Sequence, residues 1–351
     1  MAQNIERRKT RVVKVGSVCV GGTHPIAIQS MAKTKTAHAL ETAKQIRMLT
    51  EAGCEIVRLA VKDNKDAEAI TKIKKLVSVA LVADIHFDWR LALRAIECGA
   101  DKIRLNPGNI NKEEHIREVV RQAKKAGIPI RIGLNSGSIR KSDTQVKVMV
   151  GSCRRYLRIF EKLEFYDTVI SLKASDVCTT IEAYRRMAVL CDYPFHLGLT
   201  ATGLPFKGAV QSSIAIGSLL LEGIGDTIRV SLTDDPVQEV RTARYILEAL
   251  DLRRFGPRII SCPTCGRCQV DLVTIVKKLE RALESNQITR PFKIAVMGCE
   301  VNGPGEAMDA DIGIAFGRAE GLLFKNGKPL KKVSLGKCIT VLLEETRRMY
   351  D

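Results

Sequence analysis

The 351-residue sequence predicts an α/β protein, with a (β/α)8 TIM barrel over residues 1–255 followed by a small α/β domain over residues 256–351. Two observations predict the barrel. A short β-rich run followed by a helical stretch occurs eight times before residue 257, and each run ends in polar or charged residues. A third observation predicts the boundary: the pattern stops at Arg253–Pro257 (RRFGP), where a Gly-Pro pair indicates a linker.

The expected barrel strands follow one another at intervals of roughly 20 to 40 residues. They are Pro25–Met31, Cys54–Val61, Val79–Phe87, Asp101–Gly108, Ile128–Ser138, Thr168–Ser175, Pro194–Gly203 and Thr227–Asp235. Amphipathic stretches such as Leu40–Ala52 and Lys112–Ala126 lie between them, and Gly127 is placed to end the second as a helix stop. Before the first strand, Val12–Gly22 reads as a β-hairpin that plugs the barrel floor. An open doubly wound sheet is the alternative fold.

Composition narrows the function classes. The net charge of +17 suggests nucleic acid first, but aromatic residues, on which bases stack, make up only 5% of the chain. The sequence holds no apolar run of the roughly 18 residues that a membrane span needs. Its N-terminus is polar and basic, unlike a secretory signal. We therefore expect a cytoplasmic protein with neither a nucleic-acid nor a membrane partner.

Polar side chains cluster at the expected strand ends, which in a barrel all point to the face where active sites form. These residues are Arg58, Asp84, His86, Arg104, Asn106, Arg131, Asn135, Lys173, Ser175, His196, Arg229 and Ser231. Five of them are cations on five different strands, and together they would repel each other without an anionic ligand. A small diphosphate would satisfy them, because guanidinium groups bind phosphate oxygens bidentately.

Two features of this face leave alternatives open. Asp84 and His86, in the segment DIHF, are candidates for acid–base catalysis, or else form a structural pair that orients neighbouring loops. Lys173 could instead serve as the Schiff-base nucleophile of a barrel lyase or aldolase.

The second domain is expected to contain helices over Val270–Ser285 and Leu335–Met349 and strands over Phe292–Cys299 and Asp311–Phe316. Asn326-Gly327 is a typical hairpin turn. Its main feature is a group of cysteines. Cys262 and Cys265 form a C-x-x-C pair, and Cys299 ends the first strand.

Three thiolates of this kind favour an iron–sulfur cluster. Zinc would need Cys268 as a fourth ligand, because no histidine follows His196, and a zinc protein that binds nucleic acid is the matching alternative function. A redox dithiol would not need Cys299. Glu306, in NGPGE, is either an ordinary turn residue or a displaceable fourth ligand that leaves one iron open to substrate.

At these residues the chain resembles the bacterial 4-hydroxy-3-methylbut-2-enyl diphosphate synthases of the non-mevalonate isoprenoid pathway. The resemblance runs from Gly21 to the C-terminus and is most specific in IQSM, DKIRLNPGN, ISLKASD, GIGDTIRVSL, SCPTCGRC and GCEVNGPGEA. It implies a TIM barrel followed by a cluster domain. It also implies the two-electron reductive ring opening and dehydration of 2-C-methyl-D-erythritol 2,4-cyclodiphosphate to (E)-4-hydroxy-3-methylbut-2-enyl diphosphate.

The resemblance further assigns roles to residues. It implies a 4Fe–4S cluster held by Cys262, Cys265, Cys299 and Glu306. It implies that the substrate is bound by Arg58, Arg104, Arg131, Lys173 and Arg229 with Asn106, Asn135, Ser175 and Ser231. Family members are head-to-tail homodimers that take electrons from flavodoxin or ferredoxin. Two positions depart from the family: Ala201 stands where it has a Glu, and its cluster motif does not require Cys268.

Overall fold

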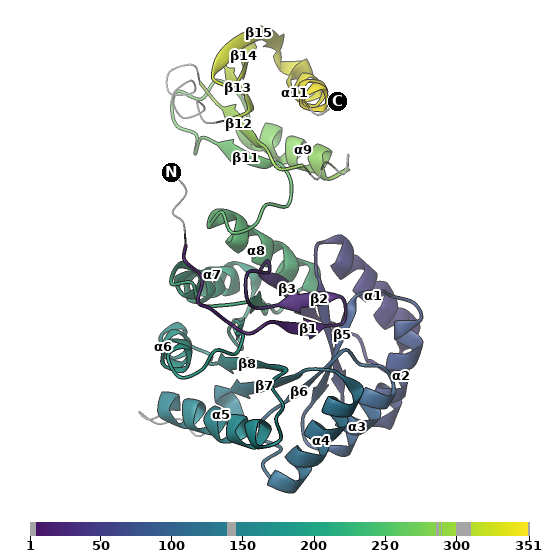
Figure 1. The fold of residues 1–351 in the computed structure, drawn as a ribbon. Helices are drawn as coiled ribbons and strands as arrows, with labels where there is room; N and C mark the ends of the chain where they lie inside the picture. The colour runs from purple at the N-terminus through teal and green to yellow at the C-terminus, as the bar shows by residue number, and fades with distance from the viewer. Residues whose placement is uncertain (1–4, 139–144, 286–287, 289, 300–309, 350–351) are drawn as a thin grey trace. The chain divides into compact units, whose positions relative to one another are not determined.

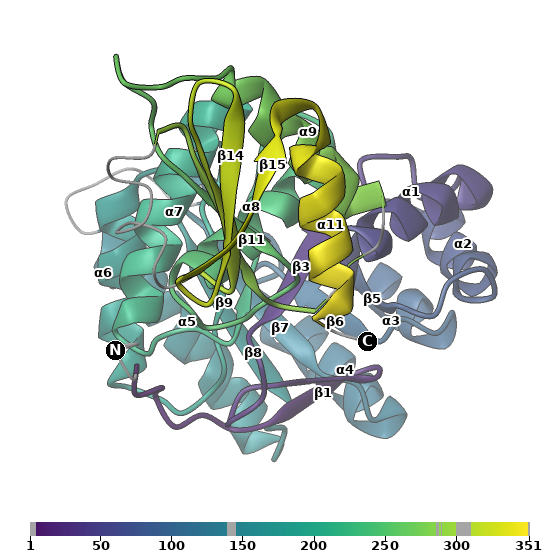
Figure 2. The same ribbon diagram turned by 90° about the horizontal axis from the view of Figure 1, so that it is seen from above.

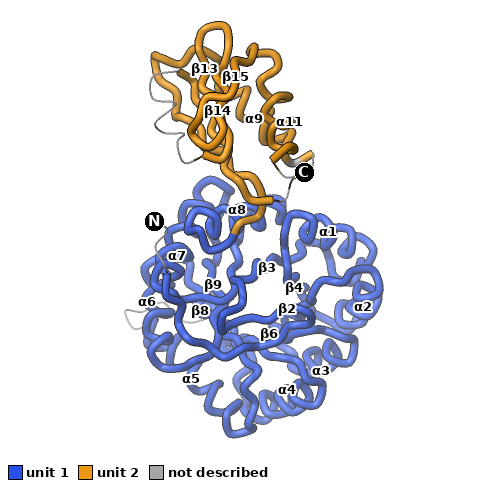
Figure 3. The backbone as a smooth tube through the Cα atoms, turned by 45° about the horizontal axis from the view of Figure 1, so that its top comes forward, with its two compact units in different colours: residues 1–253 blue, residues 254–351 orange. Residues whose placement is uncertain are grey.

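A computed structural model of the chain describes residues 5–138, 145–285, 288, 290–299 and 310–349. The chain divides into two compact units, Met1–Arg253 and Arg254–Asp351 (Figure 3). Each unit has its own sheet and its own core. In the part of the chain that the structure describes, no helix is both long and apolar enough to cross a bilayer.

The first unit is a barrel of eight parallel strands. They are β3 (Ala27–Met31), β4 (Ile56–Val61), β5 (Ala80–Ile85), β6 (Lys102–Leu105), β7 (Ile130–Asn135), β8 (Thr168–Lys173), β9 (His196–Leu197) and β10 (Thr227–Ile228). Their order is β8-β7-β6-β5-β4-β3-β10-β9, and a bridge between Ile170 and Phe195 joins the two ends. The predicted barrel is therefore confirmed and the open sheet excluded. Every predicted run contains a strand, although β9 and β10 are only two residues long.

Among the described residues, eight α-helices follow the strands and surround them (Figure 1). They are α1 (Ala39–Glu51), α2 (Asn64–Lys74), α3 (Arg90–Glu97), α4 (Glu113–Ala126), α5 (Gln145–Lys162), α6 (Val177–Ala188), α7 (Pro205–Leu221) and α8 (Pro236–Ala249). Gly127 ends α4 in the left-handed conformation, as its position after the amphipathic stretch predicts.

An N-terminal hairpin closes the bottom of the barrel. It consists of β1 (Val13–Val15) and β2 (Val18–Val20). Val15 and Val20 pack against Ala27, Ile56 and Ala80, at or near the first residues of three barrel strands. The predicted floor plug is therefore confirmed. Because the hairpin covers the N-terminal end, we expect a ligand to enter from the opposite end, where the strands finish.

The second unit has a five-stranded sheet in the order β11-β12-β13-β14-β15. Its strands are β11 (Arg258–Ser261), β12 (Lys293–Met297), β13 (Ile312–Phe316), β14 (Glu320–Lys325) and β15 (Lys328–Ser334). The first three are parallel, and β14 and β15 continue antiparallel through the predicted turn, where Asn326 and Gly327 both have positive φ. Helices α9 (Leu272–Ser285) and α11 (Cys338–Arg348) cover one face (Figure 2).

The two α-helices described in this unit, α9 and α11, begin later than the sequence predicts. Helix α9 starts at Leu272 rather than Val270, because the Asp271 carboxylate accepts a hydrogen bond from the Thr274 backbone N–H at 3.1 Å and so caps the first turn. The C-terminal helix opens with a short 3-10 turn, η2 (Leu335–Lys337), before α11.

Candidate functional site at the barrel mouth

Successive side chains along a strand point to opposite faces of the sheet. The predicted strand-end residues on β4 to β8 occupy positions whose side chains point into the barrel. Arg104 on β6 and Arg131 on β7 are both almost fully buried, although arginine is rarely found in a protein core. Gly133 on β7 makes room for one of them, because a Cβ there would lie 2.5 Å from the Arg104 Nε atom. Gly198, after β9, does the same for Lys173, whose Nζ would lie 2.7 Å away from such a Cβ.

Asp84 on β5 ties two of the arginines together. One of its carboxylate oxygens accepts a hydrogen bond from Arg104 Nη1 at 3.0 Å, and the other lies 3.7 Å from Arg58 Nε and 3.1 Å from His86 Nε2. Burial raises the pKa of Asp84, but Arg58, Arg104 and His86 outweigh burial and hold it well below its ordinary value. Asp84 is therefore an ionised anchor, and His86, whose side chain is 46% exposed, is the member of the pair that solvent or a ligand can reach.

Arg131 and Lys102 lie inside the barrel with nitrogen atoms that have no hydrogen-bond partner among the described residues. Lys102 is 0% exposed, and its Nζ atom has no hydrogen-bond partner among the described residues. The same is true of Arg131 Nε and Nη1. Burial, and then the neighbouring arginines, lower the pKa of both residues. Two buried basic side chains with unpaired donors require an anion or water, because a buried polar group without a hydrogen-bond partner is costly.

Lys102 is a residue that sequence reasoning missed. It precedes Arg104 by two positions on β6, so the period-two rule places it on the same face, one layer deeper. That signal was present in DKIRLNPG, but Lys102 lies at the start of the strand rather than at its polar end.

Lys173 and His196 form a buried pair on β8 and β9. The Lys173 Nζ atom lies 3.2 Å from His196 Nε2, and His196 Nδ1 lies 2.8 Å from the Thr227 hydroxyl. Burial is the main cause that lowers the pKa of both residues. The pKa of Lys173 is lowered further by the positive charges of four arginines, Arg229, Arg131, Arg58 and Arg104. The five predicted cations therefore lie in one region of the barrel.

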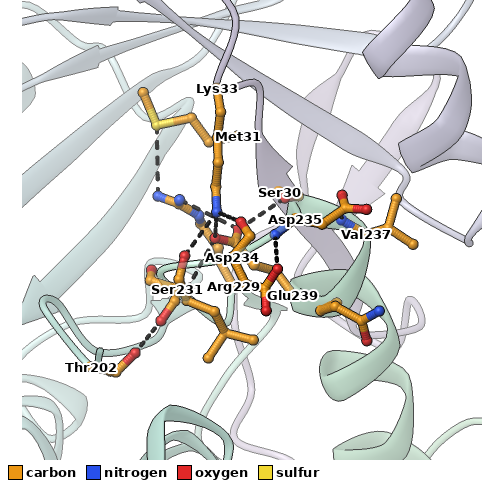
Figure 4. Close-up of polar contacts among 12 residues, drawn as sticks. Ser30, Met31, Lys33, Thr202, Arg229, Ser231, Asp234, Asp235, Val237 and Glu239 are labelled. Carbon is orange, nitrogen blue, oxygen red and sulfur yellow. Dashed lines mark hydrogen bonds and ion pairs between the residues drawn. The ribbon is translucent and has the colours of Figure 1, made fainter. Parts of the chain in front are cut away.

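The Arg229 guanidinium is held from two sides (Figure 4). Its Nη2 lies 3.5 Å from the Glu239 carboxylate, and its Nη1 lies 3.7 Å from the Met31 sulfur. The Met31 sulfur also accepts hydrogen bonds from Arg58 Nε and Nη2, at 3.1 and 2.9 Å. Met31 therefore lies between two of the predicted substrate cations.

Glu239, in the first turn of α8, is the second residue that sequence reasoning missed. Its side chain is 1% exposed and accepts hydrogen bonds from the Ser30 hydroxyl at 3.1 Å and the Leu232 N–H at 3.0 Å. Lys33 Nζ lies 3.3 Å from it (Figure 4). It therefore joins β3 to the loop after β10 at the point where it also holds Arg229. No sequence signal distinguishes it from an ordinary acidic residue at a helix start.

The remaining predicted residues occupy different depths. Asn106 is buried, and its side-chain oxygen accepts a hydrogen bond from the Gly108 N–H at 3.1 Å. Asn135 and Ser231 are half-buried, and Ser175 is exposed. Ala201, in the loop after β9, is exposed and has a φ of 55°, in the left-handed region that L-residues disfavour.

The predicted thiol ligands lie at the ends of two parallel strands in the second unit. Cys262 follows β11, and Gly298 and Cys299 follow β12. The Gly298 N–H donates a hydrogen bond to the Cys262 sulfur at 3.3 Å, and Cys265 is exposed. Within the described residues, no group of three or more His, Cys, Asp or Glu side chains is close enough to hold a metal ion. Glu306 lies outside the described residues.

Comparison with known proteins matches the whole chain. The GcpE TIM-barrel domain model matches residues 10–244, and the GcpE protein C-terminal domain model matches residues 258–348. A 4-hydroxy-3-methylbut-2-en-1-yl diphosphate synthase (flavodoxin) of Fusobacterium nucleatum subsp. nucleatum is 52% identical over 350 residues, which cover 98% of this chain and 97% of that protein. The protein of the same name from Caldanaerobacter subterraneus subsp. tengcongensis is 51% identical over 349 residues, 98% of each chain.

Some solved structures resemble this chain over about two thirds of its length. A dihydropteroate synthase from Stenotrophomonas maltophilia superposes with a TM-score of 0.54 at 14% identity, over 69% of this chain and 98% of that one. At this identity the likeness concerns the fold alone.

Proposed function

The chain belongs to the GcpE family, and we propose that its barrel mouth binds 2-C-methyl-D-erythritol 2,4-cyclodiphosphate for reduction to (E)-4-hydroxy-3-methylbut-2-enyl diphosphate. The enzyme is an oxidoreductase of isoprenoid biosynthesis, like its relatives of about 50% identity. In the net reaction, two electrons and two protons enter, the cyclic diphosphate opens, and one water leaves.

One observation carries the assignment of the substrate site: among the described residues, donors of buried basic side chains remain unpaired at the barrel mouth and in the layer below it. They belong to Arg131, Arg104, Lys102 and Arg229, none of which has a partner for all of its buried nitrogen atoms among the described residues. A diphosphate offers several charged oxygens and so meets this requirement, whereas a neutral ligand would leave the positive charge uncompensated.

The cations also contribute to the chemistry. Ring opening breaks a C–O bond to phosphate, and negative charge develops on the oxygen that leaves with the diphosphate. Guanidinium groups fixed by Asp84 and Glu239 stabilise that charge without having to reorient. We assign Asn106, Asn135, Ser175 and Ser231 to the neutral hydrogen bonds with the substrate.

His86 and Asp84 are the acid–base pair in this proposal. Asp84 is ionised and buried, so it orients the His86 ring through the contact at 3.1 Å. His86 is exposed enough to reach a substrate hydroxyl and give it the proton with which it leaves as water. Lys173 and His196 are assigned to substrate binding rather than to a Schiff base.

Cys262, Cys265, Cys299 and Glu306 are the proposed ligands of a 4Fe–4S cluster, in which Glu306 is also the proposed catalytic, displaceable ligand. The donor set fits such a cluster, because three soft thiolates select iron–sulfur clusters over harder metal sites. The N–H bond from Gly298 to the Cys262 sulfur is the type of contact that tunes a cluster potential. When bound, the cluster supplies the two electrons.

Electrons come from flavodoxin or ferredoxin, and the name of the relatives supports the former. The chain forms a homodimer, for which light scattering should give about twice the 38.7 kDa of one chain. It works in the cytoplasm, whose reducing conditions suit a chain with 11 cysteines.

The decisive experiment is an anaerobic assay of the iron- and sulfide-reconstituted chain with the cyclodiphosphate and a chemical reductant. We expect the linear diphosphate product by mass spectrometry and a visible absorption band that bleaches on reduction. A zinc protein would show no such band, and a Schiff-base enzyme would keep its activity after cluster removal. Either result would reject the proposal.

A further inference from the structure

The segment Cys262–Cys268 contains one cysteine, Cys268, that has no role in the proposed function. Cys268 is half-buried, and its Sγ atom donates a hydrogen bond to the Val270 carbonyl at 3.2 Å. It lies near the thiol of a proposed cluster ligand, Cys262, which is also half-buried.

Gly298 shows how close these two thiols are. A Cβ built on Gly298 would lie 2.4 Å from the Cys268 sulfur and 3.5 Å from the Cys262 sulfur. The two sulfurs are therefore separated by no more than the sum of these distances. A change of a cysteine side chain from one staggered rotamer to another moves its sulfur by about 3 Å, so changes of rotamer can bring the two sulfurs within bonding distance. Only glycine at position 298 leaves space for them.

The other thiol of the C-x-x-C pair is less well placed. Cys265 is exposed, whereas Cys262 and Cys268 are half-buried beside Gly298. The Cys265 carbonyl accepts a hydrogen bond from the Cys268 N–H at 2.9 Å, so Cys265 forms the turn that brings Cys268 back towards Cys262. The loop between the two ends is short, which favours their encounter.

We propose that Cys262 and Cys268 form a reversible disulfide in the cluster-free chain, and that this disulfide blocks cluster loading until a thiol reductant opens it. The disulfide itself depends only on the geometry beside Gly298. The block on loading rests on the proposed function, in which Cys262 is a cluster ligand.

The oxidation balances with a peroxide as the oxidant. One thiolate attacks the peroxide and becomes a sulfenic acid, releasing the first water. The second thiol displaces the sulfenic hydroxyl, which leaves as the second water, and the S–S bond forms. The two sulfurs together lose two electrons, which the peroxide gains. Because a sulfenic acid otherwise oxidises further and irreversibly, the pairing protects Cys262 while no cluster covers it.

Disulfide mapping tests the pairing directly. The full-length chain is stripped of iron by a chelator, treated with a stoichiometric amount of hydrogen peroxide, alkylated and digested with trypsin. Cleavage after Arg267 separates Cys268 from Cys262 and Cys265, so the expected product is a cross-linked pair of peptides, residues 259–267 and 268–277. Fragmentation should place the bond on Cys262. A Cys262–Cys265 or Cys265–Cys268 bond, or no bond, would overturn the proposal.

Cluster reconstitution without a thiol reductant tests the consequence. Oxidation should slow loading of the natural chain at least tenfold, and dithiothreitol should restore it. Cys268→Ser should load equally well before and after oxidation, whereas Cys178→Ser, which removes an exposed thiol of the barrel, should behave like the natural chain. Equal slowing in Cys268→Ser would contradict the block. If the fully reduced chain takes up no cluster although the bond is mapped, the proposed function fails and the disulfide stands.

Discussion

The barrel mouth differs from the thiol site, which consists of Cys262, Cys265 and Cys299. The difference lies in how much of each site is already in place without a ligand. At the mouth, strand register places cations on neighbouring strands, and two buried carboxylates fix three of the arginines before any ligand is present. At the thiol site, the described residues provide no group of three close metal ligands, and the cysteines lie in loops after strand ends. The difference indicates that a closed barrel can stabilise buried charge before its ligand binds, whereas the loops that hold a cluster become ordered when the cluster binds.

The largest expected effect comes from removing a thiol. Cys299→Ala should abolish both the cluster and turnover, because it removes one of the only three thiolate ligands in the proposed site. Binding of inorganic pyrophosphate to the cluster-free chain, measured by calorimetry, should remain unchanged. A parallel loss of pyrophosphate affinity would contradict the independence of the two sites.

Arg131→Met should strongly weaken pyrophosphate binding and leave the cluster in place. It removes two unpaired donors, so pyrophosphate affinity should fall by about 100-fold, in line with ~1.5–3 kcal/mol for each charged hydrogen bond and incomplete additivity. The melting temperature without ligand should rise, because an unpaired buried cation is replaced by an apolar side chain. The cluster band should persist. Lys125→Met, at an exposed lysine of α4, should change neither property.

Sequence patterns predicted the barrel because eight repeats of one period leave few alternatives, and they located the five cations because strand ends converge. Lys102 escaped because its depth in the barrel depends on where β6 begins. Glu239 escaped because only the return of α8 towards β3 buries it. The closeness of Cys262 and Cys268 depends on the approach of Gly298 from another strand, which no local pattern encodes.

Glu239→Gln tests whether preorganisation matters at the mouth. The amide keeps the shape but loses the charge that holds Arg229 and Lys33. We expect a roughly tenfold lower kcat/KM, carried mainly by a higher KM, since a freed Arg229 must be ordered by the substrate (~1.4 kcal/mol per tenfold). The control change Glu51→Gln, at an exposed position at the end of α1, should be silent. Unchanged kinetics in Glu239→Gln would show that Arg229 needs no fixed partner.

His196 makes the stability of the barrel depend on pH. Burial lowers its folded-state pKa below the unfolded value of about 6.5, so the unfolded chain binds the proton first as the pH falls. Stability should therefore be retained above about pH 6.5 and decrease below it, by at most about 1.4 kcal/mol per pH unit for this group. His196→Gln should flatten that slope in denaturant titrations at pH 7 and 5.5, whereas His38→Gln, at an exposed site, should not. Parallel slopes would exclude His196 as the cause.

The smallest effects should come from two strained residues, one at each site. Ala201 in the barrel has a φ of 55°, and Thr264, between Cys262 and Cys265, has a φ of 63°. The left-handed conformation costs about 1–2 kcal/mol for an L-residue, part of which the greater entropy of unfolded glycine offsets. Ala201→Gly and Thr264→Gly should each stabilise the cluster-free chain by about 0.5–1 kcal/mol, Thr264→Gly more, because β-branched residues suit this region least. If only Ala201→Gly stabilises the chain, the backbone between Cys262 and Cys265 relaxes when no cluster is bound. The contrast between a site formed in advance and a site ordered by its ligand then becomes sharper.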